Sequence, residues 1–109
     1  MLKDDILRET GNDLPITGGY GMYPEDAIII RPCRNHDLYS VETAVLQYLF
    51  NKYCTSYRII SQELLDDGVC VYDRFFTGCD CREDTNAPLD LTYIYFDITD
   101  CMSKPDQGD

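Results

Sequence analysis

The stretch SVETAVLQYLFNKY, residues 40–53, has the pattern of a helix that must be buried on one side. At helical spacing, one face carries the apolar residues Val41, Ala44, Val45, Tyr48 and Leu49. Ser40 is a suitable N-cap, and Glu42 in the first turn suits the positive end of the helix dipole. Because the large apolar partners available are the strand-like runs on either side, the sequence predicts a helix lying on a small sheet.

The segment before this helix predicts one more helix and one strand. Leu2 to Thr10 reads as a short helix that stops at Gly11. The apolar, β-branched run from Ala27 to Arg31 ends at Pro32 and predicts a buried strand. Between them, residues 12–26 are rich in Gly and Pro, and we expect turns there.

Three further strands are expected after the helix. Residues 57–65 and 69–76 flank Asp66-Asp67-Gly68, which is a strong hairpin signal. Residues 91–98, LTYIYFDI, have the highest β-propensity of the chain. The sequence therefore predicts an α+β two-layer fold, with about two helices packed on one face of a mainly antiparallel four-stranded sheet. The position of the first strand in that sheet stays open.

Length and composition fit one small soluble protein. We expect a single α+β domain over residues 1–102 and a flexible polar tail over residues 103–109. No run approaches the ~18 apolar residues of a membrane span. The N-terminal residues lack the apolar core of a secretory signal. These observations favour a cytoplasmic protein without a membrane partner.

The charge of the chain is strongly negative. Its net charge is -11, and 15 of its 20 acidic residues are Asp. Because Asp favours caps and turns, much of this charge is expected on loops. Such a surface repels phosphate backbones, which disfavours direct nucleic-acid binding, and it attracts a basic protein surface. Simple solubility is the alternative explanation of the same charge.

The acids expected to meet that basic surface lie on two loops of the strand region. They are Asp66, Asp67, Asp80, Glu83 and Asp84. Tyr20 and Tyr23 are candidate recognition residues in the glycine-rich segment, since Tyr is enriched at interfaces. They could instead fold back over the core, which we favour. The segment itself lacks the phosphate-loop pattern and any nearby Lys.

Cysteines and the single histidine suggest a weaker, metal-binding alternative. Cys33, His36, Cys79 and Cys81 supply four ligands, the number that suits tetrahedral zinc. The pairs lie on distant loops, so folding must bring them together. Ordinary reduced thiols and a surface histidine explain the same residues, and we expect no cofactor.

Evidence for catalysis is sparse. Asp73 and Asp97, on neighbouring predicted strands, are candidates for a paired acid site, and a solvated sheet face is the alternative. No nucleophile-elbow motif occurs. We therefore expect a non-enzyme, while a zinc-dependent or thiol-dependent small enzyme remains an alternative.

The sequence thus predicts a small acidic protein-binding domain, such as an inhibitor or immunity-type protein that masks a basic surface. A structural domain that forms a homodimer through an edge strand, with residues 91–98 as the candidate, is the second class.

Overall fold

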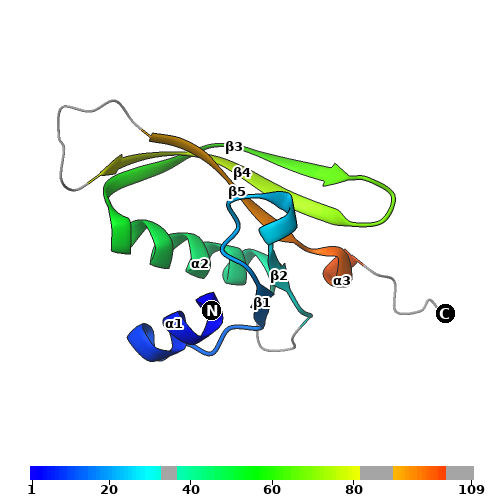
Figure 1. The fold of residues 1–109 in the computed structure, drawn as a ribbon, viewed down its shortest axis with the longest axis horizontal. Coiled ribbons are helices and arrows are strands. Elements are labelled where there is room, and N and C mark those ends of the chain that lie inside the picture. Colours follow the sequence, from blue (N-terminus) through cyan, green and yellow to red (C-terminus); the bar gives the residue numbers. More distant parts are fainter. Residues whose placement is uncertain (33–36, 82–89, 103–109) are drawn as a thin grey trace.

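Five strands form one mixed sheet in a computed structural model that describes residues 1–32, 37–81 and 90–102 (Figure 1). The side chains of residues 53–55, 79–81 and 90 are not described. The strands are β1 (Ile16–Gly18), β2 (Ile28–Ile30), β3 (Cys54–Asp66), β4 (Val71–Cys81) and β5 (Asp90–Asp97). The helical elements are α1 (Leu2–Thr10), the 3-10 turn η1 (Pro24–Asp26), α2 (Leu38–Tyr53) and α3 (Thr99–Met102). Their order across the sheet is β1-β2-β5-β4-β3.

The last three strands form the predicted antiparallel meander. Strand β4 pairs with β3 on one side and with β5 on the other. The turn between β3 and β4 closes as its sequence predicts, because Gly68 adopts a φ of 90°. The Asp67 carboxylate accepts hydrogen bonds from the backbone N–H groups of Val69 and Cys70 at 2.9 and 2.7 Å. Hairpin formation therefore uses Asp67 as a local acceptor.

The α+β class is confirmed, but the sheet has five strands rather than four, and it is mixed because β2 and β5 pair in parallel while the other three pairings are antiparallel. The prediction missed β1, because a strand of three residues inside a Gly- and Pro-rich segment leaves no periodic pattern. β1 pairs antiparallel with β2, whereas β2 runs parallel to β5 through Ile28 opposite Phe96 and Ile29 opposite Asp97. Strand β5, the candidate dimer edge, consequently lies between β2 and β4. There are also three α-helices rather than two among the described residues.

Helix α2 begins two residues before the predicted start. Asp37 rather than Ser40 caps it, since the Asp37 carboxylate accepts the backbone N–H of Ser40 at 2.7 Å. This earlier start moves Glu42 out of the first turn and onto a buried face of the helix. The predicted interaction of Glu42 with the positive end of the helix dipole is therefore wrong.

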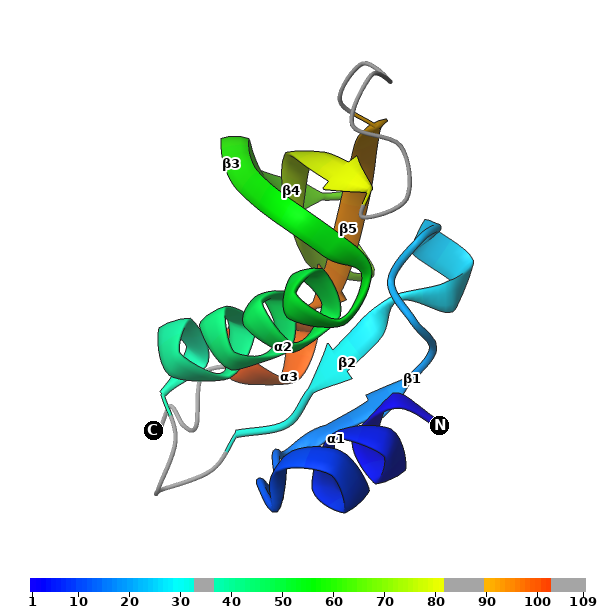
Figure 2. The same ribbon diagram turned by 90° about the vertical axis from the view of Figure 1, so that its left-hand side faces the viewer.

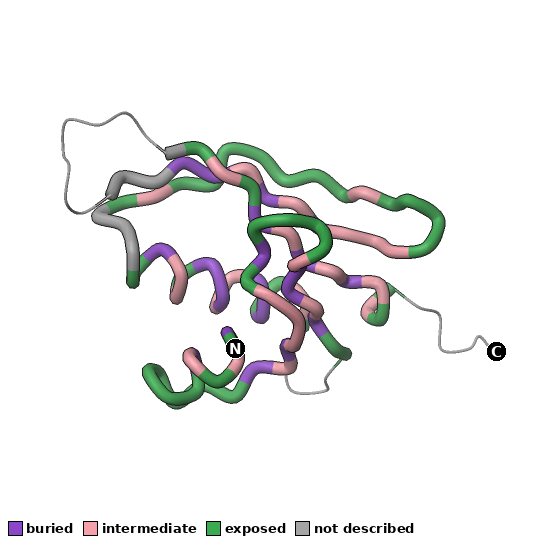
Figure 3. Tube along the Cα trace, viewed as in Figure 1, coloured by how far each residue is buried: buried purple, intermediate pink, exposed green. Residues whose placement is uncertain are grey.

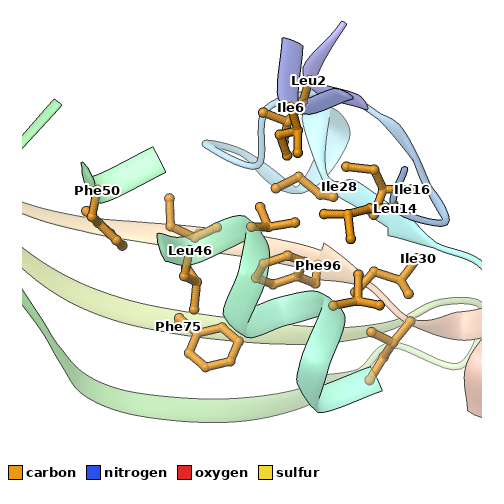
Figure 4. Packing of buried hydrophobic residues seen from close by; sticks show 14 residues of the cluster. Leu2, Ile6, Leu14, Ile16, Ile28, Ile30, Leu46, Phe50, Phe75 and Phe96 are labelled. Carbon is orange, nitrogen blue, oxygen red and sulfur yellow. The ribbon is translucent and has the colours of Figure 1, made fainter. Parts of the chain in front are cut away.

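Helices α1 and α2 share one apolar core with the sheet (Figures 2 and 4). Helix α1 contributes Leu2 and Ile6, and it ends at Gly11 in the left-handed conformation, as expected. Helix α2 contributes the buried residues Val41, Val45, Leu46 and Phe50. Phe96 of β5 is fully buried near the centre of this cluster.

Exposure differs along the sheet. Buried positions lie in β2, β4 and β5, whereas β3 is exposed along most of its described length (Figure 3). No helix in the described part of the chain is both long and apolar enough to cross a membrane. The predicted tail, residues 103–109, lies outside the described residues, and the single-domain division over residues 1–102 stays a prediction.

Candidate functional site

Aromatic side chains gather on the face of the sheet opposite α2. Residues that pair directly across strands share a face, and alternate residues of β4 and β5 therefore point away from the core. The face formed in this way, called here the tyrosine face, consists of Tyr72, Arg74, Phe76, Tyr93 and Tyr95. In Figure 1, α1 and α2 lie on the other side of these strands. No described α-helix covers the tyrosine face, and η1 borders one end of it.

Arg74 organises the centre of the tyrosine face. Its guanidinium lies 4.3 Å from the ring centre of Tyr93 and 5.9 Å from that of Tyr95. The same guanidinium forms an ion pair with Glu63 of β3. The hydrogen bond with Glu63 raises the pKa of Arg74 further above its ordinary value. Stacking and pairing together hold the rings in place and neutralise the cation of this face.

An acidic hollow of about 560 Å³ lies where this face meets the glycine-rich segment. Its wall includes Gly19, Tyr20, Glu25, Asp26, Tyr72 and Asp97. Three of these side chains are carboxylates, and two are tyrosines that offer a ring and a hydroxyl. Such a wall suits a positively charged group, such as the side chain of Lys or Arg.

The backbone of residues 18–27 is shaped by internal hydrogen bonds. Gly19 N–H donates to the Ala27 carbonyl at 3.1 Å, and Gly21 N–H donates to the Asp26 carbonyl at 2.8 Å. A Cβ on Gly19 would lie 1.6 Å from the Asp26 carboxylate, so only glycine fits there. The Gly21 carbonyl accepts the backbone N–H of Tyr95 at 2.7 Å, which fastens the loop to β5.

This loop presents Tyr20 and Tyr23 to solvent. Both side chains are exposed, so the expectation that they cover the core is wrong. The positive φ angles of Gly18 and Gly21 turn the segment outward between them. The Tyr20 hydroxyl also donates to Asp5 of α1 at 3.0 Å. Tyr20 therefore borders the acidic hollow in a fixed position.

The negative charge near the acidic hollow also affects the pKa of Tyr72. The pKa of Tyr72 is raised first by its hydrogen bond with Cys70 and by burial, and then by the charges of Cys70, Asp97 and Asp67. Asp97 is held in place because it accepts hydrogen bonds from the backbone and hydroxyl of Thr99 at 3.0 and 2.6 Å. One end of the tyrosine face is thus strongly electronegative.

A second pair of acids lies in the core, on the opposite side of the sheet. Glu42 of α2 is 3% exposed and Asp73 of β4 is 4% exposed. Burial, followed by a hydrogen bond with Asp73 and the charge of Asp73, raises the pKa of Glu42 to about 9. Gln62 donates to both Asp73 carboxylate oxygens at 2.8 Å. Glu42 is therefore protonated at neutral pH, which avoids burying its negative charge beside Asp73.

This core pair replaces the predicted pairing of Asp73 with Asp97. Asp73 pairs across the ladder with Phe96, whereas Asp97 pairs with Tyr72, so the two acids point to opposite faces. A signal for Glu42 exists in the sequence, because it precedes Leu46 and Phe50 by four and eight residues on one helix face. Because Glu42 was expected to interact with the helix dipole in the first turn, its position on the buried face was not recognised.

The predicted partner-binding acids do not form one group. Asp66 pairs with Val71 at one end of the hairpin, and Asp80 pairs with Ser56 near the other end. At ~3.3 Å per residue along β4, these ends are about 30 Å apart. Glu83 and Asp84 lie outside the described residues. Asp67, in contrast, adds to the electronegative end of the tyrosine face, because its charge helps to raise the pKa of Tyr72.

The sequence groups Glu25 with Asp26 but does not indicate that Asp97 lies across the hollow from them. The parallel pairing of β2 with β5 creates this proximity between distant parts of the chain. No local pattern encodes such a pairing.

The zinc prediction falls outside the described structure. Cys33 and His36 are not described, and the side chains of Cys79 and Cys81 are not described either. Among the residues that are described, no three His, Cys, Asp or Glu side chains gather as a metal site. The zinc and thiol alternatives remain predictions.

Comparison with protein-family models, with curated proteins and with solved structures finds no match for this chain.

Proposed function

We propose that the protein is a small acidic, non-catalytic binding domain that masks a basic surface on another protein, as an inhibitor or immunity-type protein would. The observation that carries this proposal is the uncovered tyrosine face that ends at the acidic hollow. Tyrosines supply rigid contact area, and the carboxylates beside them supply charge complementarity. The proposal places the protein in the cytoplasm, where thiols such as those of Cys70 and Cys101 stay reduced.

The contact would be centred on two groups of side chains. Tyr93 and Tyr95 would pack against the partner, and Glu25, Asp26 and Asp97 would receive one of its Lys or Arg side chains in the hollow. Tyr20 and Tyr23 keep their proposed role at the border of this contact. Asp66 and Asp67 would extend the negative field at the same end of the sheet, which speeds the encounter with a basic partner.

Capture from cells that produce the protein, at low and at high salt, tests this proposal. Glu25→Gln removes a charge from the hollow, whereas Gln47→Lys raises the net charge by the same amount from an exposed position on α2. We expect a basic protein that is released by salt, and we expect Glu25→Gln to weaken its capture more than Gln47→Lys does. Recovery of no basic protein, or equal weakening by both variants, would contradict the proposal.

A further inference from the structure

The two edges of the sheet differ in how they are protected. Strand β1 is three residues long, follows Pro15 and packs near α1. Strand β3 is thirteen residues long and contains neither Pro nor Lys. Short edges, Pro, Lys and covering elements are the usual devices that prevent an edge from pairing with another chain. β3 has register irregularities at Cys54–Ser56 and Ile59–Ser61, which are themselves a protective device, but residues 61–66 pair with β4 without interruption.

The outer backbone edge of residues 58–65 of β3 pairs with no other described strand. Among the described residues, their backbone hydrogen bonds are confined to the ladder with β4, and no strand lies on their other side. Ile59, Ile60 and Leu64 are 47%, 45% and 61% exposed along the same segment. An exposed apolar strand with an open backbone edge is a template for strand addition.

We propose that this edge of β3 binds an extended, basic segment of another protein as an added sixth strand. The basic character rests on the proposed function and on local charge. Glu63 already pairs with Arg74, so the local surplus of negative charge over Arg58 comes from Asp66 and Asp67 at the hairpin end of β3. A second copy of the chain is a poorer occupant, because each copy carries a net charge of -11 and the copies repel one another.

The register specifies what the added strand should look like. Ile59 and Leu64 pair with Thr77 and Asp73 and so face the α2 side, whereas Glu63 pairs with Arg74 and faces the tyrosine side. An added strand that alternates apolar and basic residues would place its apolar side chains beside Ile59 and Leu64. Its remaining side chains would lie on the side of Glu63, which is already paired with Arg74, and its basic residues would be favoured at the hairpin end, next to Asp66 and Asp67.

The probe for this proposal is a synthetic peptide that alternates valine and lysine. One control peptide replaces lysine with glutamate, and another keeps the side chains but carries methyl groups on alternate backbone nitrogens. We expect the valine–lysine peptide to slow amide exchange and shift amide NMR signals within residues 58–65. Both control peptides should fail to do so, because one reverses the charge and the other removes strand hydrogen bonds.

A matched pair of protein variants locates the binding. Leu64→Lys places a charge beside the added strand and should weaken binding of the peptide by about tenfold or more. Val69→Lys adds the same charge at an exposed position of the hairpin turn and should cost much less. Equal losses, or peptide-induced signals confined to other parts of the chain, would overturn the proposal. So would concentration-dependent dimerisation that protects residues 58–65 without peptide.

The hollow variant separates this proposal from the proposed function. If strand addition is correct and binding at the hollow is not, Glu25→Gln leaves the protection of residues 58–65 unchanged and also has no effect on capture of a basic protein. If only the hollow binds, the peptide shifts signals of Tyr72 and Asp97 and leaves residues 58–65 unaffected.

Discussion

At the scale of single residues, Glu42 is the least expected feature of the core. A carboxyl group occupies a position on α2 where its neighbours Val41 and Val45 are fully buried. One of its oxygens, Oε2, has no hydrogen-bond partner among the described residues. Such a group is tolerated in the core when it is neutral, because burying the charged form is far more costly. Folding therefore raises the affinity of Glu42 for its proton.

The first prediction concerns how stability depends on pH. In the unfolded chain Glu42 loses its proton near its ordinary pKa of 4.5, whereas the folded protein holds that proton up to about pH 9. Between these values the native state binds more protons, so the free energy of unfolding falls as pH rises, by at most ~1.4 kcal/mol per unit for one proton. The contribution is fully present below pH 4.5 and is lost by pH 9.

Glu42→Gln removes this titration while keeping a donor for Asp73. In urea unfolding, we expect Glu42→Gln to be as stable as the wild type near pH 4.5 and more stable than the wild type near pH 9. Glu25→Gln, at an exposed carboxylate, is the control and should follow the wild-type profile. If stability depends on pH in the same way for the wild type and Glu42→Gln, burial does not raise the pKa of Glu42.

The second prediction concerns the loop that forms the hollow. Gly19→Ala should destabilise the protein by ~1–3 kcal/mol, because the added methyl group overlaps the Asp26 carboxylate and carbonyl. Gly11→Ala is the comparison, since its Cβ would meet no atom within 4 Å and only its positive φ costs energy, about 1 kcal/mol. Chemical denaturation measures both variants. A smaller loss for Gly19→Ala than for Gly11→Ala would contradict the described loop.

At the scale of elements, α1 depends on docking rather than on its own propensity. A helix of nine residues is marginal in isolation, so its two buried side chains must hold it on the body. An ion pair adds to this contact, because Lys52 of α2 donates to Glu9 of α1 at 3.0 Å. That pair is partly exposed, so we expect apolar burial to dominate.

The third prediction compares adjacent residues of α1. Ile6 is 1% exposed and Leu7 is 44% exposed. Ile6→Ala should lower the free energy of unfolding by ~2–5 kcal/mol, since it leaves a cavity in the core. Leu7→Ala should cost less than ~1 kcal/mol, because its side chain already meets solvent. Thermal or urea unfolding distinguishes them, and similar losses would mean that α1 packs through another face.

Elements with a strong local pattern could be predicted from the sequence. The helix at α1, the helix at α2 and the Asp66-Asp67-Gly68 turn depend on neighbouring residues, and each was placed to within a few residues. Strand β1 has no such pattern, because its three residues are a strand only through pairing with β2. The acidic hollow could not be predicted for the same reason, since it depends on β2 lying beside β5.

At the scale of the whole molecule, negative charge is the dominant property. A net charge of -11 on 109 residues repels itself in the compact state. Few described cations are left to offset it, because Lys3, Arg8, Lys52 and Arg74 already form ion pairs with carboxylates. The surface that remains is available to a partner of opposite charge.

The fourth prediction follows from this self-repulsion. Adding sodium chloride should raise the midpoint of thermal unfolding, because salt screens repulsion between carboxylates more than it weakens the few exposed ion pairs. Differential scanning calorimetry at low and moderate salt measures the effect. A decrease in the midpoint would mean that ion pairs such as Lys52–Glu9 outweigh the net repulsion.

The pairing of β2 with β5 predicts that the chain folds in two stages. Residues of the β3–β4–β5 meander meet near neighbours in the sequence, whereas Ile28 must find Phe96 across most of the chain. Closing so long a loop has a large entropic cost, so the first thirty residues should dock last on a preformed helix and meander. Docking of these residues completes both the core and the acidic hollow. Residues 1–30 and the rest of the chain, supplied as separate polypeptides, should therefore reassemble the hollow.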